Sequence, residues 1–407
     1  MSNYFWIDEK RNEIISYDIL LKLLQQHTLR KFIRAENPFE MVLDLLTGMA
    51  NGLEMTLFDS DFSDTELSSL GYDVTTISRE NVFQKNVVNN SSWNALEEQI
   101  KDSGWKLWMF TSGTTGLPKK VCHTYQSLAR NVKISEKHQS DIWAFAYRLS
   151  HMAGLQVLLQ ALMNQNTIVY VFESRPEVVI QQLEKYKCTH ISATPTFYRN
   201  ILPFLNNNGQ LRSVTMGGEK FDVSLHEAIK QKLPKVQIHN IYATTETGTL
   251  LVAKLDGFEI PEKFKDKVRI SESGELHIHN SLLGKFALEE EWYNTHDIVT
   301  EKDGLLYFQS RQSDLVNVGG YKVNLLEVEQ EILQVEGVLD CAVKSRANSV
   351  MGNMLYAELV ISEQADKVKV KQNIITRLKQ NLQAYKIPRI YKFVESVEKT
   401  RTGKKVR

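Results

Sequence analysis

Short apolar strands alternate with helical segments along the middle of this chain, and this order constrains the fold more than any other feature. The segments KLWMF (106–110), TIVYVF (167–172) and THISAT (189–194) have the length of buried strands, and a helix opened by Pro176 separates the last two. SVTMGG and IHNIYAT continue the series. Such alternation predicts a mainly parallel sheet covered by helices. We therefore expect an α/β protein with a large N-terminal domain of helix-covered, mainly parallel sheets.

After Arg311 the pattern changes to that of a small, separate α/β unit. Helices are expected in NLLEVEQEILQ, opened by an Asn324/Glu327 variant of the capping box, and in VKQNIITRLKQNL. The segments VLDCAVK, MLYAELVI and RIYKFV read as strands. We expect the boundary just after Ser313, which gives a large domain of residues 1–313 and a small C-terminal domain of residues 314–407.

Composition excludes several classes of protein. The chain has 49 Lys and Arg against 49 Asp and Glu, so it offers no basic surface for nucleic acid or for an acidic membrane. The three cysteines, Cys122, Cys188 and Cys341, are far apart and have neither disulfide-framework nor metal-ligand spacing. No apolar run is long enough to span a bilayer, and the N-terminus lacks a signal-peptide core. We expect a soluble cytoplasmic protein with no membrane span and no nucleic-acid partner.

The segment FTSGTTGLPKKV lies directly after the predicted strand at 106–110 and has the character of a phosphate-binding loop. Small and hydroxyl side chains let backbone N–H groups approach a polyanion, and a lysine adds positive charge. The spacing differs from the Walker A pattern, which disfavours a P-loop kinase or ATPase. The candidate phosphate ligands are Thr111, Ser112, Gly113, Thr114, Thr115, Gly116 and Lys119.

This loop resembles the phosphate-binding signature of the adenylate-forming superfamily, which includes acyl- and aryl-CoA synthetases, peptide-synthetase adenylation domains and luciferases. Further segments resemble the family's motifs in the family's order. TMGGEKF resembles the loop beside adenine, and IYATTETG resembles the motif in which a threonine touches phosphate and a glutamate holds Mg²⁺. The resemblance assigns nucleotide binding to Gly217, Gly218, Glu219, Tyr242 and Thr244, phosphate contact to Thr245, and the metal to Glu246.

The segment WYNTHDIV resembles the family's Thr-Gly-Asp stretch. Asp297 then matches the acid that binds the ribose hydroxyls, while His296 stands where the family has glycine, so that the local backbone is expected to differ. Two segments beside the expected acyl pocket, RLSHMAGL and ATPTFYRNIL, give His151 and Thr194 as substrate-region candidates. For His151 a buried structural role is an equally weighted alternative.

The end of the chain resembles the family's mobile C-terminal domain. Arg311 corresponds to a ribose or phosphate contact, and Asp314 to the hinge about which the small domain turns. Gly319 and Gly320 correspond to the loop that faces the site during thioester formation. In KTRTGKKV, Lys404 matches the catalytic lysine, and the side chain of its neighbour Lys405 is expected to point to solvent. The first hundred residues are shorter than the family norm.

Together these matches imply an enzyme that uses ATP and Mg²⁺ to adenylate a small carboxylic acid and then transfers the acyl group to coenzyme A. One alternative is loading of the acid onto the phosphopantetheine of a carrier protein; Lys322, Lys344 and Arg346 are candidate charges for binding CoA instead. A second alternative is a non-catalytic ATP-binding regulator. The pocket segments resemble aryl- and small-acyl-CoA synthetases, including the o-succinylbenzoate and coumarate types, and Asp141 or Asp222 stays open as an anchor for an amino acid. The acid and the oligomeric state are not predicted.

Overall fold

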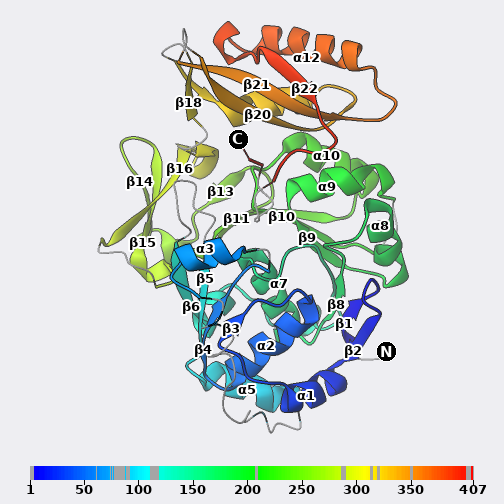
Figure 1. Ribbon diagram of the computed structural model, residues 1–407, viewed down its shortest axis with the longest axis vertical. Coiled ribbons are helices and arrows are strands. Elements are labelled where there is room, and N and C mark those ends of the chain that lie inside the picture. The colour runs from blue at the N-terminus through cyan, green and yellow to red at the C-terminus, as the bar shows by residue number, and fades with distance from the viewer. Residues whose placement is uncertain are drawn as a thin grey trace.

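The computed structural model describes residues 4–60, 62–73, 75, 77, 88, 92–110, 119–206, 210–285, 290–311, 315–318, 321–348, 352–399 and 405–406. Figure 1 shows a large body built from the N-terminal part of the chain and a smaller unit, from the C-terminal part, above it. In the described residues no helix is long and apolar enough to cross a membrane. All three cysteines are free and buried.

The first part of the chain forms a four-stranded sheet with helices packed on it. Its strands run in the order β3 (Phe32–Ile33), β4 (Glu54–Leu57), β5 (Lys106–Phe110) and β6 (Lys120–Thr124), and the last pair is antiparallel. Around it lie α1 (Tyr17–Gln26), α2 (Pro38–Ala50), α3 (Asp64–Ser69), α5 (Trp93–Asp102) and α6 (Tyr125–Ala129). Apolar residues on nearly every face of α2 explain why it is buried throughout its length rather than on one stripe.

The expected mainly parallel sheet is present, with eight strands among the described residues. Strands β11 (Gln237–Thr244), β10 (Ser213–Gly217), β9 (His190–Ala193), β7 (Ile142–Phe145), β8 (Thr167–Tyr170) and β1 (Tyr4–Asp8) are parallel neighbours in that order. Antiparallel β12 (Gly248–Ala253) and β2 (Glu13–Ser16) close its two edges. The connecting helices are α7 (Met152–Met163), α8 (Pro176–Lys185), α9 (Pro195–Ile201) and α10 (Val223–Lys232). Pro176 occupies the first turn of α8, where its missing N–H costs nothing.

A third sheet, antiparallel throughout, was not predicted. Its order is β13 (Gly257–Glu259), β17 (Leu305–Arg311), β16 (Trp292–Lys302), β15 (Glu275–His279) and β14 (Val268–Ile270). In the β16–β17 pair Asp297 stands opposite Arg311. Short 3₁₀ turns complete the connections: η1 (Glu136–His138), η2 (Leu202–Phe204), η3 (Glu262–Phe264), η4 (Asn280–Leu282) and η6 (Ala384–Lys386).

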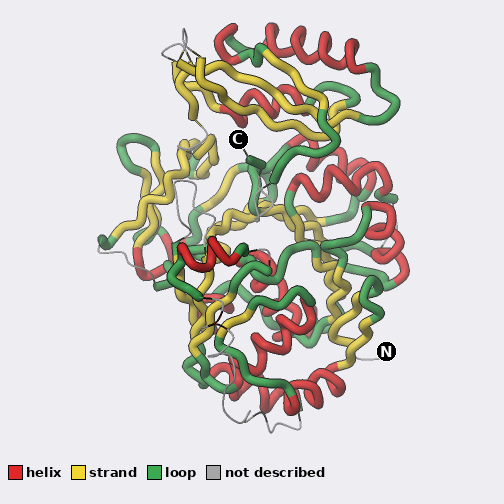
Figure 2. Tube along the Cα trace, viewed as in Figure 1, coloured by secondary structure: helices red, strands yellow, loops and turns green. Residues whose placement is uncertain are grey.

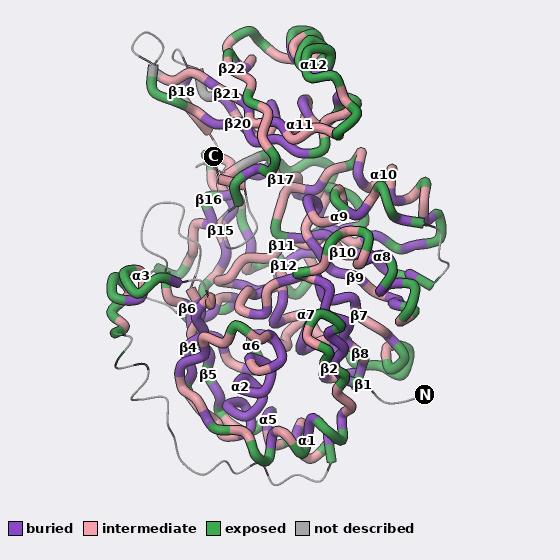
Figure 3. The backbone as a smooth tube through the Cα atoms, turned by 45° about the vertical axis from the view of Figure 1, so that its right-hand side comes forward, coloured by how far each residue is buried: buried purple, intermediate pink, exposed green. Residues whose placement is uncertain are grey.

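The C-terminal unit has the three strands and two helices that the sequence predicts, preceded by a hairpin of β18 (Leu315–Val318) and β19 (Tyr321–Asn324). Strands β20 (Val338–Asn348), β21 (Gly352–Ile361) and β22 (Ile390–Phe393) form its sheet, and α11 (Leu325–Leu333) and α12 (Lys367–Asn381) cover it (Figure 2). A separate apolar core lies between them, and Figure 3 shows α12 largely exposed on its outer side. Residues 312–314, which contain the expected boundary, lie outside the described residues.

The predicted capping box of α11 is only half formed. The Oδ1 of Asn324 accepts a hydrogen bond from the N–H of Leu326 at 3.0 Å, as an N-cap requires. The carboxylate of Glu327 does not return to the helix end; both its oxygens lie 2.8 Å from the ammonium of Lys386. The prediction that the Glu327 carboxylate accepts a hydrogen bond at the start of the helix is therefore wrong. Lys386, in the turn η6, offers that carboxylate a charged donor instead.

Candidate active site

The residues assigned to nucleotide binding gather at one edge of the eight-stranded sheet. Strands β9, β10 and β11 are adjacent and parallel, so their carboxyl ends meet at that edge, where open α/β sheets bind ligands. Each strand delivers part of the predicted site. The residues brought to this edge are Thr194 after β9, Gly217, Gly218 and Glu219 at the end of β10, and Thr244, Thr245 and Glu246 at the end of β11.

The loop after β10 is fixed by its own backbone and by α9. Gly218 has φ of +81°, a left-handed conformation that glycine adopts without strain. The Oε2 of Glu219 accepts hydrogen bonds from the N–H and the hydroxyl of Thr196, at 3.1 and 2.7 Å. Its Oε1 is buried and has no hydrogen-bond partner among the described residues. Since a buried acceptor is costly without a donor, this oxygen is poised to receive one from a ligand.

Asp297 is the centre of a charged cluster between the eight-stranded sheet and the antiparallel five-stranded sheet. Its carboxylate accepts a hydrogen bond from the hydroxyl of Tyr242 at 2.6 Å and another from the Nε of Arg311 at 2.7 Å. Burial would lower the pKa of Arg311, but Asp297, Tyr242 and Glu246 together outweigh it and raise that pKa. Burial and the carboxylate of Asp297 raise the pKa of Tyr242. A carboxylate has about four acceptor positions, so two remain for further donors such as ribose hydroxyls.

His296 adopts the backbone conformation that explains the family's glycine at this place. Its φ is +58°, in the left-handed region, and its N–H donates to the Oδ1 of Asn294 at 2.7 Å. Histidine tolerates this region better than most residues, although a side chain there costs about 1–2 kcal/mol relative to glycine. The turn before Asp297 therefore has a glycine-like shape without a glycine.

Two side chains that the sequence analysis did not identify as site residues form hydrogen bonds with Glu246 and Thr245. The hydroxyl of Tyr293, on β16, donates to the Oε1 of Glu246 at 3.1 Å. The Nε2 of His123, on β6, lies 2.7 Å from the carbonyl oxygen of Thr245 and must carry the proton, because a carbonyl only accepts. Burial lowers the pKa of His123, which keeps the ring neutral. Tyr293 lies within the segment WYNTHDIV, but no local sequence pattern indicates its contact with Glu246 or the contact of His123 with Thr245.

The backbone at Gly284 and Lys285 links the segment after β11 to strand β6 of the four-stranded sheet. Its N–H donates to the carbonyl oxygen of Glu246 at 2.7 Å, and the next residue, Lys285, exchanges two backbone hydrogen bonds with Cys122 of β6, each 2.8 Å. A Cβ atom on Gly284 would lie 2.7 Å from the ring of His123 and 2.8 Å from the carbonyl oxygen of Cys122. Only glycine fits at this approach without displacing backbone.

His151 and Thr194 hold structural positions at the predicted substrate side. Thr194 caps α9 by accepting a hydrogen bond from the N–H of Phe197 at 3.2 Å. His151 precedes α7, and its Nε2 lies 3.4 Å from the Oδ1 of Asp59, a polar contact too long for a well-formed hydrogen bond. Although burial favours protonation of Asp59, His151 and Ser150 outweigh it and lower the pKa of that carboxyl. The acyl-pocket role of both candidates stays a prediction.

Several predicted site residues lie outside the described residues. These are 111–116 of the phosphate loop, Asp314, Gly319, Gly320 and Lys404. Lys119 is described and is exposed just before β6. The phosphate side of the site and the catalytic lysine therefore stay predictions.

The prediction that Lys405 points to solvent is wrong. Its ammonium lies 2.7 Å from the Oδ1 of Asp340 and donates to the carbonyl oxygen of Cys341 at 2.6 Å, and its side chain is only 6% exposed. The neighbouring backbone is also docked, since the N–H of Val406 donates to the carbonyl oxygen of Glu398 at 3.0 Å. A lysine can be buried here because a buried carboxylate on β20 compensates its charge.

Two other charge assignments also change. Lys344 is 10% exposed and paired with Glu358 at 2.9 Å, so it cannot contribute to a basic surface for CoA; Arg346 is exposed, and the side chain of Lys322 lies outside the described residues. Asp222 caps α10 and lies 2.9 Å from Arg199, which leaves it poorly suited to anchor an amino group.

Comparison with known proteins places this geometry in a family. A model described as AMP-binding enzyme matches residues 45–273, and one described as AMP-binding enzyme C-terminal domain matches residues 327–404. The 2-succinylbenzoate–CoA ligase of Listeria monocytogenes (strain F2365) is 28% identical over 324 residues, covering 73% of this chain and 67% of the relative. Its counterpart in Staphylococcus aureus (strain MRSA252) is 27% identical over 387 residues, covering 86% and 76%.

Solved structures agree on the fold. The o-succinylbenzoate CoA synthetase of Bacillus subtilis, bound to its acyl-adenylate intermediate, superimposes with a TM-score of 0.71 at 20% identity, over 99% of this chain and 94% of the other. An anthranilate CoA ligase bound to anthranoyl-AMP gives 0.74 at 16% identity, over 99% and 92%. The resemblance drawn from the motifs is confirmed, and so is the predicted α/β fold: the chain belongs to the AMP-binding enzyme family.

Proposed function

We propose that this chain is an AMP-forming acid–thiol ligase, which adenylates a carboxylic acid with ATP and transfers the acyl group to coenzyme A. The Tyr242–Asp297–Arg311 cluster, beside the carboxyl edge of β9–β11, is the observation that supports this most directly. It presents a buried, charged carboxylate with acceptor positions left for a ribose. The relatives named above are CoA ligases, which supports CoA as the acceptor.

In the first step an oxygen of the substrate carboxylate attacks the α-phosphorus of ATP. The bond from that phosphorus to the bridging oxygen breaks, pyrophosphate leaves, and an acyl-adenylate is formed. Because carboxylate and triphosphate repel each other, the protein contributes mainly position and charge compensation. Asp297 would hold the ribose hydroxyls, Arg311 would add positive charge beside the nucleotide, and the free Oε1 of Glu219 would accept from the adenine side.

Mg²⁺ fits the residues at the end of β11. The Oε1 of Glu246 accepts from Tyr293, and its Oε2 has no hydrogen-bond or ion-pair partner among the described residues. A hard divalent cation prefers such carboxylate oxygens together with phosphate oxygens. When bound, the ion would neutralise the charge that develops on pyrophosphate. Thr245, whose carbonyl is fixed by His123, would contribute its hydroxyl to the phosphates.

We also propose that residues 314–407 form a mobile domain that serves both steps. Lys404 would compensate charge during adenylation and move away before the thiol attacks the acyl carbon and AMP leaves. Asp314 would be the hinge, and Gly319 and Gly320 would then face the site. The end of the chain supports this, because Lys405, the neighbour of Lys404, is held on the small unit by Asp340, so Lys404 would move with that unit.

The acid proposed for the first test is 2-succinylbenzoate, since the relatives from Listeria and Staphylococcus act on it by name. Purified protein would be assayed for pyrophosphate release with ATP, Mg²⁺ and a panel of aromatic, aliphatic and amino acids, with and without CoA. We expect acid-dependent release and, with CoA, an acyl-CoA product identified by mass. Release without acyl-CoA would favour a carrier protein as acceptor, and no release with any acid would favour a non-catalytic ATP-binding protein.

A cytoplasmic location is proposed on chemical grounds. All three cysteines are free and buried, which suits a reducing compartment.

A further inference from the structure

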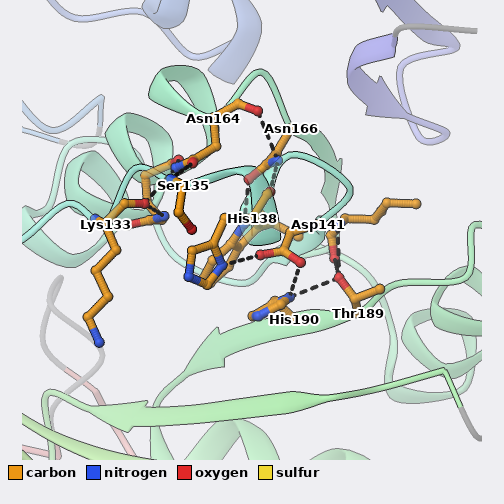
Figure 4. A network of polar contacts seen from close by, with 11 residues as sticks. Lys133, Ser135, His138, Asp141, Asn164, Asn166, Thr189 and His190 are labelled. Carbon is orange, nitrogen blue, oxygen red and sulfur yellow. Dashed lines mark hydrogen bonds and ion pairs between the residues drawn. The ribbon is translucent and has the colours of Figure 1, made fainter.

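Two histidines and an aspartate gather at the edge of the eight-stranded sheet opposite the candidate active site. His138 ends the turn η1, Asp141 directly precedes β7, and His190 is the first residue of β9 (Figure 4). The candidate active site lies beyond the other end of β9, four residues away at Thr194, or about 13 Å at the usual rise of a strand. The proposed ligase reaction uses none of these three residues.

Their side chains meet, with the carboxylate of Asp141 between the two imidazole rings. The Nδ1 of His138 lies 2.8 Å from one carboxylate oxygen of Asp141, and the Nδ1 of His190 lies 3.6 Å from the other. One ligand atom from each residue falls within 4.8 Å of the other two. In a tetrahedral zinc site with ligand distances of about 2.0–2.2 Å, ligand atoms are about 3.3–3.6 Å apart. The two observed separations involve different oxygens of Asp141: the 3.6 Å separation has the length expected at a zinc site, and the 2.8 Å separation is that of a hydrogen bond, which His138 would give up on binding the ion.

The charge of Asp141 has no ordinary counter-ion. Asp141 is buried, and within the described part of the chain its ion-pair partners are these two imidazoles. The comparable pair His27–Asp44 differs, because the guanidinium of Arg30 also lies 3.4 Å from Asp44. A buried carboxylate is expensive unless a cation balances it. Within the described part of the chain Asp141 thus has no direct ion pair with a lysine or arginine, although burial lowers the pKa of His190 most and the guanidinium of Arg212 is close enough to help lower it.

The surrounding network fixes the three residues in place. The side-chain amide of Asn166 donates to the carbonyl oxygen of His138 at 2.6 Å, and the ring of Trp143 lies against that of His190 with centroids 4.7 Å apart. The hydroxyl of Thr189 accepts from the N–H of Ile142 at 2.8 Å and lies 2.8 Å from the Nδ1 of His190. A bound cation would replace the latter contact and the hydrogen bond between His138 and Asp141. Such outer partners orient metal ligands.

We propose that His138, Asp141 and His190 bind a borderline divalent cation such as Zn²⁺, with water in the fourth position. Imidazole nitrogen and carboxylate oxygen are the donors that Zn²⁺ takes and that Mg²⁺ disfavours in this ratio. The side chain of His138 is 25% exposed, which gives the ion and its water access from solvent. The ion would tie the turn before β7 to the start of β9 and so stabilise the sheet from the side away from catalysis.

The experiment is a titration of the full chain with Co²⁺, a coloured substitute for Zn²⁺, in excess Mg²⁺ and without ATP, followed by competition with Zn²⁺. We expect one equivalent to give the visible absorption of a tetrahedral Co²⁺ centre and Zn²⁺ to displace it. His138→Gln and His190→Gln should each weaken binding at least about tenfold. His27→Gln removes a histidine from the comparable pair with Asp44 and should bind like the wild type.

Thermal unfolding gives a second readout that does not depend on ligase activity. Zn²⁺ should raise the melting temperature of the wild type and of His27→Gln but not of His138→Gln, whose partly exposed side chain is a mild change for the fold. Equal Co²⁺ affinity in the wild type and His138→Gln, or no tetrahedral spectrum, would overturn the metal site and leave Asp141 as a hydrogen-bonded bridge between two imidazoles.

Discussion

Asp297 in the large domain and Asp340 in the small unit are both buried carboxylates with a basic nitrogen at 2.7 Å, yet their surroundings differ. The partner of Asp297, Arg311, is 34% exposed, and the cluster lies between two sheets beside the site edge. The partner of Asp340, Lys405, is 6% exposed, and a second lysine, Lys399, lies 3.9 Å from its other oxygen. The same kind of ion pair is thus accessible to solvent in one place, where we propose that it binds the ribose, and closed off in the other, where it anchors the end of the chain.

Removal of Lys405, whose ammonium pairs with Asp340, is expected to have the largest effect on the free energy of unfolding. Lys405→Met would leave Asp340 as a buried, poorly compensated charge and should destabilise the protein by about 3–5 kcal/mol in urea unfolding. Burial lowers the pKa of Lys405, but Cys341, Glu329 and Asp340 outweigh it and raise the pKa, so this stabilisation holds at neutral pH and is lost only as pH rises through that raised pKa.

Lys399→Met is the matched control for that measurement. Its ammonium is more distant from Asp340 and its side chain is one third exposed, so a loss below about 1 kcal/mol is expected. Equal losses for the two variants would mean that Lys405 is not the anchor.

Lys404, the neighbour of Lys405, is expected to affect the adenylation step and to leave folding intact. Lys404→Ala is expected to slow adenylation by about 10²–10³-fold, the scale of removing one preorganised charge-stabilising group. Synthetic acyl-adenylate plus CoA should still give thioester at a near-normal rate, because the small domain would have carried Lys404 away by then. The two half-reactions, measured separately, test this. Equal loss of both would contradict the proposed domain alternation.

Glu246→Gln tests the proposed magnesium ligand. Loss of one negative charge from the metal site should cut adenylation by about a hundredfold while the urea midpoint stays unchanged. The effect should shrink as Mg²⁺ is raised, because the remaining oxygen still binds weakly. Glu301→Gln, an exposed position on β16, is the control and should match the wild type. Normal pyrophosphate release by Glu246→Gln would refute the assignment.

Asp297→Asn tests whether Asp297 binds the nucleotide, in contrast to Asp340, whose expected role is to stabilise the fold. The amide keeps an acceptor but loses the charge, so the KM for ATP should rise by about tenfold, within the range for hydrogen bonds to charged groups. Its stability loss should be smaller than that of Lys405→Met, because Arg311 can reach water. If unfolding were the dominant effect and the KM were unchanged, Asp297 would be an anchor as well.

His296→Gly should give the smallest change. Glycine relieves the strain of φ +58° but also gains freedom in the unfolded chain, which costs about 0.4–1 kcal/mol. A net stabilisation below about 1 kcal/mol is expected in urea unfolding, with unchanged adenylation. A clear loss of stability would show that the contact of His296 with Glu275, 3.6 Å between Nδ1 and Oε1, matters more than the backbone.

The strands β8 to β11 and the residues at their carboxyl ends could be predicted, because strand length, glycines and motif order are local properties of the sequence. The antiparallel sheet β13–β17 was missed, since its pairing joins segments that carry no comparable signal. Lys405 was misjudged for a physical reason. A lysine is exposed by default, and only the fold brings Asp340 to it. The contact of Tyr293 with Glu246 likewise joins two motifs whose proximity the sequence does not encode.

The close approach at Gly284 bears on how this enzyme could be altered. A single α-carbon there faces the ring of His123 and the backbone of Cys122, both on β6, while its own N–H is bonded to the carbonyl oxygen of Glu246, which follows β11 of another sheet. In a saturation library we expect this position to tolerate no replacement, whereas positions along the acid-binding side can vary one at a time. Substrate preference could then diverge through small steps, while the junction at Gly284, beside the proposed magnesium ligand Glu246, would change only together with its neighbours on β6 and after β11.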